Sequence, residues 1–160
     1  MATAYIETTI PSYYTARNAR SVLQAGRQLA TRDWWDSGCS GFDLVTSTET
    51  LNEAGAGKRE MAKARLELLK GIRVLPVTES VAGLARRLVF SGLVPAIAAP
   101  DAVHIALASA NRIDFLVTWN FKHIANPRTR ERLRATINEE GHHMPVMCSP
   151  EELLNDDEDF

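Results

Sequence analysis

The sequence of 160 residues is poor in cysteine and contains no long apolar run. Its two cysteines, Cys39 and Cys148, stand far apart without CxxC spacing or histidine partners, so neither a disulfide framework nor a zinc site is expected. No apolar stretch approaches the ~20 residues needed to span a bilayer. The N-terminus also lacks the charged and apolar segments of a signal peptide. We therefore expect a cytoplasmic protein without a membrane segment.

Several common enzyme motifs are absent as well. The chain contains no GxSxG elbow, no P-loop and no GxGxxG stretch, so acyl transfer and nucleotide binding by these motifs have no support. A metal-dependent phosphatase or another α/β hydrolase remains an alternative.

Charge is distributed unevenly along the chain. The formal net charge is −2, but the last ten residues, EELLNDDEDF, carry six acids and no base. Residues 1–150 therefore hold 14 acids and 18 bases, a net charge of +4. A mildly basic body with an acidic tail can bind a polyanion, although an ordinary solvated surface has the same charge. We assign residues 1–150 to one domain and residues 151–160 to an acidic C-terminal tail.

Five short apolar runs alternate with longer helical patterns. The predicted strands are 4–7, 42–46, 73–77, 115–118 and 145–148, and the predicted helices are 19–37, 58–70, 78–91, 100–112 and 127–140. In the first helix, the candidate buried residues are Val22, Leu23, Leu29 and Trp34. Trp35 is a candidate for an exposed partner surface. Because strands that alternate with helices need crossover connections, we predict a three-layer α/β/α sandwich with a short, mainly parallel sheet.

Four polar residues are predicted to meet at the carboxyl edge of this sheet. Glu7 ends the first strand, Asp101 lies in the first turn of the helix before the fourth strand, and Asn120 follows that strand. Ser47 is expected to cap a helix that carries Glu53, whose side chain leans back toward the helix N-terminus. Each residue alone has an ordinary structural role, so the prediction depends on their convergence.

Clustered carboxylates repel one another unless a cation lies between them. Oxygen ligands without His or Cys spacing suit Mg²⁺ or Mn²⁺ better than zinc. The predicted metal ligands are therefore Glu7, Glu53 and Asp101, with Asn120 as an auxiliary catalytic ligand. Such a metal polarises a phosphoryl oxygen and supplies an activated water, and a second ion can stabilise the leaving oxygen.

Further residues near this edge are candidates for auxiliary roles: Thr8, Thr9, Ser47, His104, Thr118 and His123. His104 lies three residues after Asp101, and His123 lies three residues after Asn120, so either histidine could contact a phosphate or transfer a proton. His104 has the alternative role of a half-buried packing residue bonded to a neighbour. A threonine hydroxyl could orient a metal-bound water or cap the next helix instead.

The segments that carry these residues resemble the PIN domain, in particular the VapC-type toxins of bacterial toxin–antitoxin pairs. The likeness rests on the acid that ends strand one, the spacing from Ser47 to Glu53, and the stretch DAVHIALASANRIDFLVTWNFKHI. It covers residues 4–124. The resemblance implies an α/β/α fold, a Mg²⁺- or Mn²⁺-dependent endoribonuclease acting on RNA such as tRNA, a homodimer and an antitoxin partner.

The sequence departs from the family pattern at Glu7 and Asn120, within ETTIPSY and TWNFKHIAN, since the family typically has Asp at both positions. Glu7 keeps the charge but lengthens the side chain by one methylene, whereas Asn120 keeps only a carbonyl oxygen as a ligand. Three acids remain, which supports one metal ion and leaves a second open. The alternative is a catalytically impaired PIN-like module that binds RNA or a protein partner without cleavage.

Overall fold

The centre of the molecule is a five-stranded parallel sheet, seen in a computed structural model that describes residues 1–154. The strands are β1 (Ala2–Ile6), β2 (Phe42–Ser47), β3 (Arg73–Leu75), β4 (Phe115–Val117) and β5 (Val146–Cys148). Their order is β3-β2-β1-β4-β5, and all four pairings are parallel. Each strand overlaps its predicted range. Residues 155–160, most of the predicted acidic tail, lie outside the described residues.

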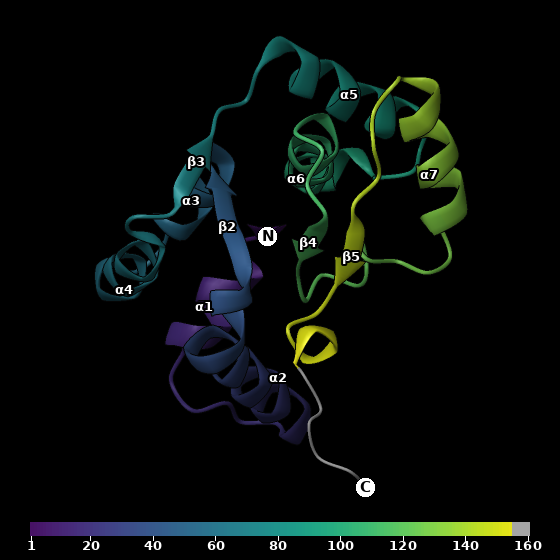
Figure 1. The fold of residues 1–160 in the computed structure, drawn as a ribbon. Helices are drawn as coiled ribbons and strands as arrows, with labels where there is room; N and C mark the ends of the chain where they lie inside the picture. The colour runs from purple at the N-terminus through teal and green to yellow at the C-terminus, as the bar shows by residue number, and fades with distance from the viewer. Residues whose placement is uncertain (155–160) are drawn as a thin grey trace, which may run out of the picture.

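Helices cover both faces of the sheet, which confirms the predicted α/β/α architecture (Figure 1). The α-helices are α1 (Thr9–Thr15), α2 (Val22–Asp33), α3 (Thr48–Ala54), α4 (Arg59–Leu69), α5 (Glu79–Phe90), α6 (Ala99–Ala110) and α7 (Arg130–Glu139). Short turns are η1 (Trp34–Gly38), η2 (Cys39–Gly41), η3 (Ala96–Ala98) and η4 (Glu151–Leu153). Figure 1 shows α1, α2 and α4 on one side of the sheet and α5, α6 and α7 on the other. Within residues 1–154, no helix has the length and apolar character needed to cross a membrane.

Each face of the sheet has its own hydrophobic core, because successive side chains of a strand point to opposite faces. Tyr5 of β1 packs into the core formed with α5, α6 and α7. Its neighbours Ala4 and Ile6 pack into the other core, together with the fully buried Trp34. Trp34 is therefore a core residue as predicted, whereas Trp35 is half-buried against it.

Helix starts follow the sequence signals closely, with one helix missed. Ser47 Oγ accepts a hydrogen bond from the Thr50 amide at 3.0 Å, and Thr78 Oγ1 accepts one from the Val81 amide at 3.3 Å, so both residues cap their helices. Sequence reasoning did not predict α1, a seven-residue helix that contains Pro11. Proline fits there because it lies in the first turn, where its missing N–H has no partner to lose.

The burial predicted for α2 is wrong at three positions. Val22, Leu23 and Leu29 are 92%, 65% and 62% exposed. The buried residues of this helix are the polar Gln28 and Thr31. Their side chains hydrogen-bond to the end of α1 and to the indole that follows β4. These polar contacts, rather than the aliphatic residues, therefore determine which face of α2 points inward.

Two leucine-to-alanine substitutions, one on the exposed face of α2 and one in the core, test this orientation of α2 by their effects on stability. Leu29→Ala is expected to change the free energy of unfolding by less than about 0.5 kcal/mol, because the side chain is already in water. Leu107→Ala, at a residue with 0% exposure, is expected to cost about 2–5 kcal/mol through lost burial and a cavity. Urea unfolding of both variants checks this. Similar losses in the two variants would contradict the observed orientation.

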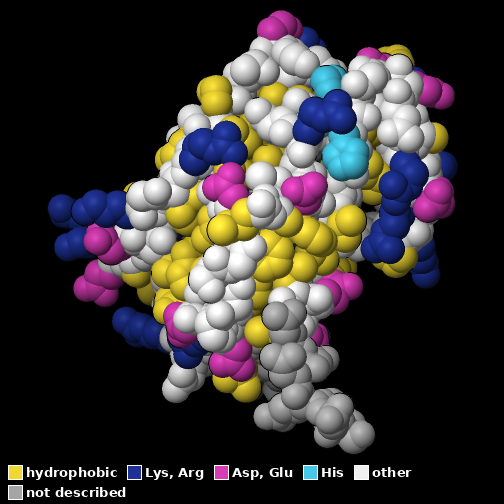
Figure 2. Space-filling view, in the orientation of Figure 1, with side chains coloured by type: hydrophobic (Ala, Val, Ile, Leu, Met, Phe, Trp, Pro, Cys, Tyr) yellow, Lys and Arg dark blue, Asp and Glu magenta, His cyan; other side chains and the backbone are white. Residues whose placement is uncertain are grey.

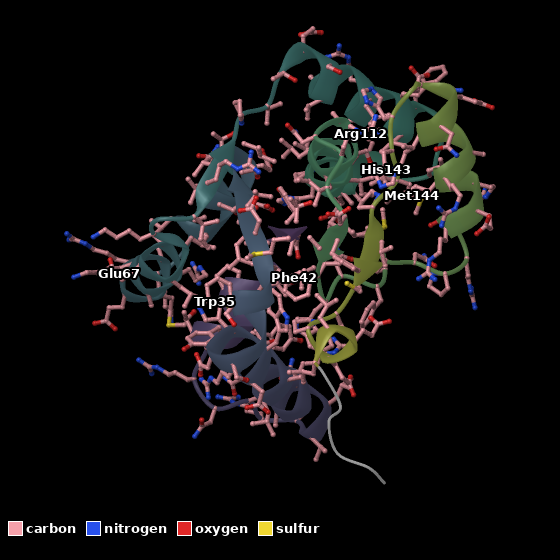
Figure 3. All side chains as sticks on the ribbon, in the orientation of Figure 1. Trp35, Phe42, Glu67, Arg112, His143 and Met144 are labelled. Atoms are coloured by element: carbon pink, nitrogen blue, oxygen red, sulfur yellow. The ribbon has the colours of Figure 1, made fainter. Side chains whose placement is uncertain are left out.

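Figure 2 shows the side of the molecule where the chain begins, with hydrophobic side chains gathered at its centre and Lys and Arg mainly around its periphery. Figure 3, in the same orientation, labels Phe42 and Trp35 near this centre. Both side chains are half-buried. Because Phe42 is the first residue of β2, this side carries the amino ends of the strands. The predicted functional residues lie at the opposite end of the sheet.

Candidate functional site

Glu7 and Thr118 lie side by side at the carboxyl ends of the two central strands. The register of β1 and β4 pairs Ile6 with Val117, so the next residue of each strand extends from the same edge. The Glu7 amide donates to the Val117 carbonyl at 3.3 Å, and Thr118 Oγ1 donates to Glu7 Oε2 at 2.8 Å. Parallel pairing thus brings the predicted ligand Glu7 into contact with the auxiliary candidate Thr118.

Glu7 is a buried carboxylate, only 3% exposed. Its Oε2 accepts hydrogen bonds from the Thr9 amide at 3.0 Å, from Thr9 Oγ1 at 2.6 Å and from Thr118 Oγ1 at 2.8 Å. These donors compensate the loss of water around the charge. No hydrogen bond from residues 1–154 reaches Oε1 of Glu7, so this second oxygen is available to a ligand. The Thr9 hydroxyl orients Glu7 rather than capping a helix.

Glu53 of α3 is held beside Glu7 by Thr8 and His104. Its Oε1 accepts a 2.8 Å hydrogen bond from Thr8 Oγ1 and contacts His104 Nε2. Thr8 occupies the N-cap position of α1, but its side chain makes no capping bond, so the capping alternative fails for Thr8 too. Burial alone would raise the pKa of Glu53, but the hydrogen bond and charge of His104, with the Thr8 bond, outweigh it and lower the pKa.

His104 is completely enclosed, with 0% exposure. Its Nδ1 lies 2.7 Å from Tyr5 Oη, and its Nε2 contacts Glu53. Burial alone would lower the pKa of His104, but the hydrogen bond to Glu53 and the charges of Glu7 and Glu53 raise it. Of the two roles considered for His104, contact with a phosphate is excluded, because an enclosed ring cannot touch a substrate. The packing alternative is correct, with deeper burial than expected.

Tyr5, which sequence reasoning missed, continues this network into the core. Its hydroxyl lies 2.6 Å from Ser47 Oγ and 3.3 Å from Thr50 Oγ1. Thr50 Oγ1 donates to the carbonyl that ends β1, and Ser47 Oγ donates to Thr50. The 2.6 Å bond joins the Ser47 and Tyr5 hydroxyls and the 2.7 Å bond joins the Tyr5 hydroxyl to His104 Nδ1, so the network runs without a break from Thr50 to Glu53. Burial strongly raises the pKa of Tyr5, which stays a neutral phenol.

Asp101 approaches the same edge from the first turn of α6 and is half-buried. Burial raises the pKa of Asp101, and the charge of Glu53 raises it further, while a hydrogen bond from Asn120 and the charges of His104 and His123 oppose this rise. Asn120 Oδ1 also accepts the His123 amide at 2.9 Å. Asn120 therefore has the ordinary turn-forming role considered for it and, in addition, contacts the candidate acid.

The structure thus brings the four predicted residues to one edge, although not as a finished metal cage. Among residues 1–154, no group of three His, Cys, Asp or Glu side chains is arranged so that it could hold a metal ion. The donor chemistry nevertheless fits Mg²⁺ or Mn²⁺. Glu7 and Glu53 each have one carboxylate oxygen that no hydrogen bond from the described residues reaches. A nearby cation would also offset the raised pKa of Asp101. The acids at this edge thus have the ligand type that Mg²⁺ or Mn²⁺ requires, but they are not arranged around a common centre.

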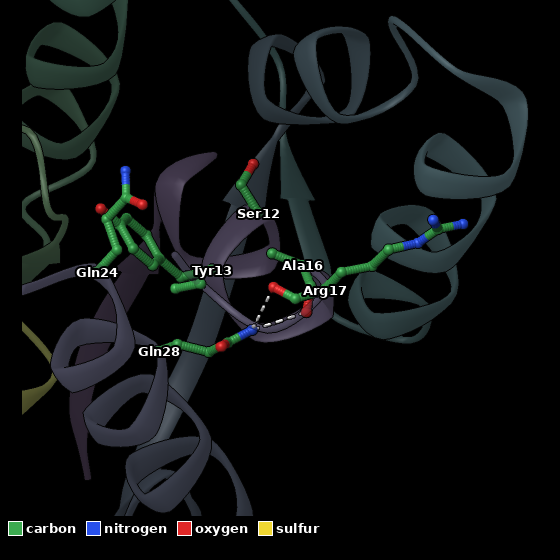
Figure 4. Close-up of a pocket in the computed structure, with 7 residues that line it drawn as sticks. Ser12, Tyr13, Ala16, Arg17, Gln24 and Gln28 are labelled. Carbon is green, nitrogen blue, oxygen red and sulfur yellow. Dashed lines mark hydrogen bonds between the residues drawn. The ribbon is translucent and has the colours of Figure 1, made fainter. Parts of the chain in front are cut away.

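A hollow of about 270 Å³ between α1 and α2 is separate from these acids (Figure 4). Its lining includes Ser12, Tyr13, Arg17, Gln24 and Gln28, and none of the four predicted residues. The Gln28 side-chain amide donates to the carbonyl of Ala16 at 2.7 Å and to that of Arg17 at 3.4 Å. These bonds join the end of α1 to α2, so the hollow lies at a structural junction.

Comparisons with known proteins identify the fold but not the sequence family. No protein-family model and no curated protein matches the sequence. Among solved structures, a chain in the crystal structure of VapBC2 from Rickettsia felis bound to a DNA fragment from their promoter matches with a TM-score of 0.53. The match covers 92% of this chain and 98% of that chain at 16% identity. The protein therefore has a PIN-like α/β/α fold. Within that class, its architecture is VapC-like.

Proposed function

We propose that this protein is a Mg²⁺- or Mn²⁺-dependent endoribonuclease that hydrolyses RNA phosphodiesters. The observation that carries the proposal is the convergence of Glu7, Glu53 and Asp101 on the carboxyl edge of a PIN-like sheet. The three acids come from three separate segments of the chain, and Asn120 lies next to Asp101. Acids from three segments that gather at one edge of a sheet are typical of a functional site, and their chemistry fits a divalent cation.

Glu7, Glu53 and Asp101 would hold the metal ion. When bound, this ion supplies polarisation of a phosphoryl oxygen and a water of lowered pKa. The hydroxyls of Thr9 and Thr118 keep Glu7 in position. Glu7 is thus preorganised, whereas the three acids together would have to rearrange to enclose a metal ion.

The two histidines have different roles in this proposal. His104 is enclosed and orients Glu53 from the core side. His123 is partly exposed next to Asn120, and in this proposal it would donate a proton to the leaving oxygen of the RNA.

We further propose that the protein is the toxin of a type II toxin–antitoxin pair in the cytoplasm, with RNA such as tRNA as substrate, an antitoxin as inhibitor and a homodimer as the assembly. The VapBC2 structure contains a protein of this fold in a complex with promoter DNA. Exposed apolar side chains offer surface for partners to cover, among them Val22 and Leu23 of α2 and Phe90 at the end of α5.

A catalytically impaired module that binds RNA or a protein partner without cleavage is the alternative. The observation that favours it is Asn120, which stands where the resembled family has an acid and which already accepts a hydrogen bond from the His123 amide. A module of this kind would not need to keep three acids at one edge.

Incubation of the purified protein with labelled total tRNA in Mn²⁺, in Mg²⁺ and in EDTA tests the proposal. We expect cleavage in either metal and none in EDTA, together with calorimetric binding of Mn²⁺. No cleavage and no Mn²⁺ binding would contradict the proposal. The Asn120→Asp variant separates the alternatives, because Asp can still accept the His123 amide while adding a charge. Cleavage that appears only in this variant would establish the impaired module.

A further inference from the structure

Three cations from two separate segments of the chain line one hollow of about 450 Å³. Arg17 follows α1, whereas Lys58 and Arg59 begin α4, and all three side chains are exposed. We call this space the α4 hollow. Among the ion pairs formed within residues 1–154, none includes any of the three cations. Because like charges that face one space repel one another, an anion in the α4 hollow would be favoured.

The lining of the α4 hollow is positive on balance. It includes one acid, Glu60, so three positive charges and one negative charge leave a net charge of +2. A second hollow of about 580 Å³ shares Arg59 and adds Lys63, Lys70 and Glu67. Figure 2 shows Lys and Arg side chains projecting on the left, where Figure 1 places α4. The positive surface therefore continues along this helix and suits a ligand with several negative charges.

Hydrogen bonds to backbone carbonyls hold both segments that form the α4 hollow. The Gln28 side-chain amide donates to the carbonyl of Arg17 at 3.4 Å, and Figure 4 shows the Arg17 side chain extending away from Gln28. On the other segment, the Arg65 guanidinium donates to two carbonyls between α3 and Lys58, at 2.8 Å and 2.6 Å. The backbone on each side is thus preorganised, while the three cationic groups remain exposed to a ligand.

The same two segments lead to the candidate site. Thr8, directly before α1, donates to Glu53 of α3 at 2.8 Å, and α1 packs against α4. Lys58 follows Glu53 by five positions, so their Cα atoms are at most about 18 Å apart. A polymer with one phosphate at the acids can therefore place another phosphate in the α4 hollow.

We propose that Arg17, Lys58 and Arg59 bind backbone phosphates of an RNA strand, a few nucleotides away from the phosphate at the acids. Contacts from Lys and Arg to phosphates position a nucleic acid without reading its sequence. A phosphate beside the acids needs a metal ion between the charges, whereas a phosphate in the α4 hollow meets cations directly. The inference rests on the proposed function for the identity of the polymer, but it does not require cleavage.

An acidic peptide is the competing occupant of the α4 hollow, because it too would neutralise the cations. The lining favours RNA instead. Protein interfaces usually have a buried centre of aromatic or aliphatic side chains with few charges. Among the residues that line the α4 hollow, Met61 is the only apolar one, and the rest are charged. A ligand held mainly by charge, as a phosphate backbone is, fits this lining better than a peptide does.

Salt-dependent binding of RNA tests the proposal without cleavage. The probes are fluorescein-labelled single-stranded dodecamers of uridine and of adenosine, followed by fluorescence anisotropy in Ca²⁺, which suits the oxygen ligands of the acids. The test variant combines Arg17→Gln, Lys58→Gln and Arg59→Gln. We expect its affinity for both probes to fall at least roughly tenfold at low salt. The slope of log K against log salt should decrease by about 2, because each lost phosphate contact removes about 0.7.

A charge-matched variant on α7 is the control. It combines Arg130→Gln, Arg132→Gln and Arg134→Gln, which are exposed residues on the opposite side of the sheet from α4 (Figure 1). It loses the same three positive charges, so any effect of net charge alone is equal in the two variants. We expect its affinity and its salt slope to stay close to those of the wild type.

Equal effects of the two triple variants, or no binding of RNA by the wild type, would overturn the proposal and leave the α4 hollow to an acidic peptide. A loss confined to one probe would overturn it too, because the cations would then read bases. The inference and the proposed function fail separately. Metal-dependent cleavage with an unchanged KM in the test variant would remove only the phosphate site. The expected change of slope without cleavage in any metal would remove only the nuclease.

Discussion

Asp101→Asn is expected to abolish metal-dependent RNA cleavage while making the metal-free protein more stable. Loss of a metal-binding carboxylate removes several kcal/mol of transition-state stabilisation, which corresponds to at least a roughly hundredfold loss of rate. The opposite effect on stability follows because burial and the charge of Glu53 raise the pKa of Asp101 in the folded state. The fold therefore disfavours the charged carboxylate, and a neutral amide removes that cost.

Thermal unfolding with and without Mn²⁺ measures both parts of this prediction. In EDTA, the variant is expected to unfold at a higher temperature than the wild type near pH 7. Because the pKa of Asp101 is higher in the folded state than in the unfolded state, folding takes up a proton at low pH. The difference in unfolding temperature should therefore shrink as the pH falls through the raised folded pKa toward the unfolded value of 3.8. Mn²⁺ should raise the unfolding temperature of the wild type and leave that of the variant unchanged. An equal rise in both proteins would show that Asp101 is not a ligand, whatever happens to cleavage.

His104→Ala is expected to give the largest loss of stability among the site variants, about 3 kcal/mol. The substitution leaves a cavity in the core, removes the His104 partner of the Tyr5 hydroxyl and leaves the Glu53 carboxylate without its strongest donor. Tyr5→Phe removes only one hydroxyl of the same network and should cost about 1–2 kcal/mol. Urea unfolding of the two variants measures these losses in the free energy of unfolding. A smaller loss for His104→Ala than for Tyr5→Phe would contradict the role of His104 as the main stabilising residue of the network.

A double-mutant cycle between His104→Ala and Glu53→Gln isolates the contact itself, with an expected coupling of about 1–3 kcal/mol. The pKa of Glu53 is lowered from 4.5, so its contribution is present above that pH and is lost as the pH falls through the lower folded value. The pKa of His104 is raised from 6.5, so its contribution is present below that pH and is lost as the pH rises through the higher folded value. The coupling should therefore be largest between pH 4.5 and 6.5, and a coupling independent of pH would indicate a neutral hydrogen bond.

The candidate site illustrates how far sequence reasoning reaches. Strand ends and helix starts are local signals, and they were sufficient to place Glu7, Asp101 and Asn120 at one edge of the sheet. The Ser47 cap also fixed where α3 begins, and with it the position of Glu53. What the sequence did not indicate is that Tyr5 would be the partner of His104, because this contact joins two residues 99 positions apart. A tyrosine in a buried strand carries no sign of which helix its hydroxyl will meet.

The error in the burial predicted for α2 has a physical cause. Hydrophobicity predicted that Val22, Leu23 and Leu29 would turn inward, but the hydrogen bonds of Gln28 and Thr31 turn the opposite face toward the sheet. Buried polar groups must find partners, and these partners lie on other elements. Burial patterns read from one helix at a time therefore miss contacts that depend on how two elements meet.

The sequence by itself determined the class of fold, the order of its elements and the edge at which the acids gather. Alternating apolar runs and helical patterns require parallel strands with crossovers, and parallel strands end together at one edge. Only the tertiary structure decided that His104 is enclosed and bound to Glu53, that Tyr5 completes its network, and that the aliphatic face of α2 is exposed. Those features depend on side-chain contacts between distant segments, and periodicity along the chain carries no information about such contacts.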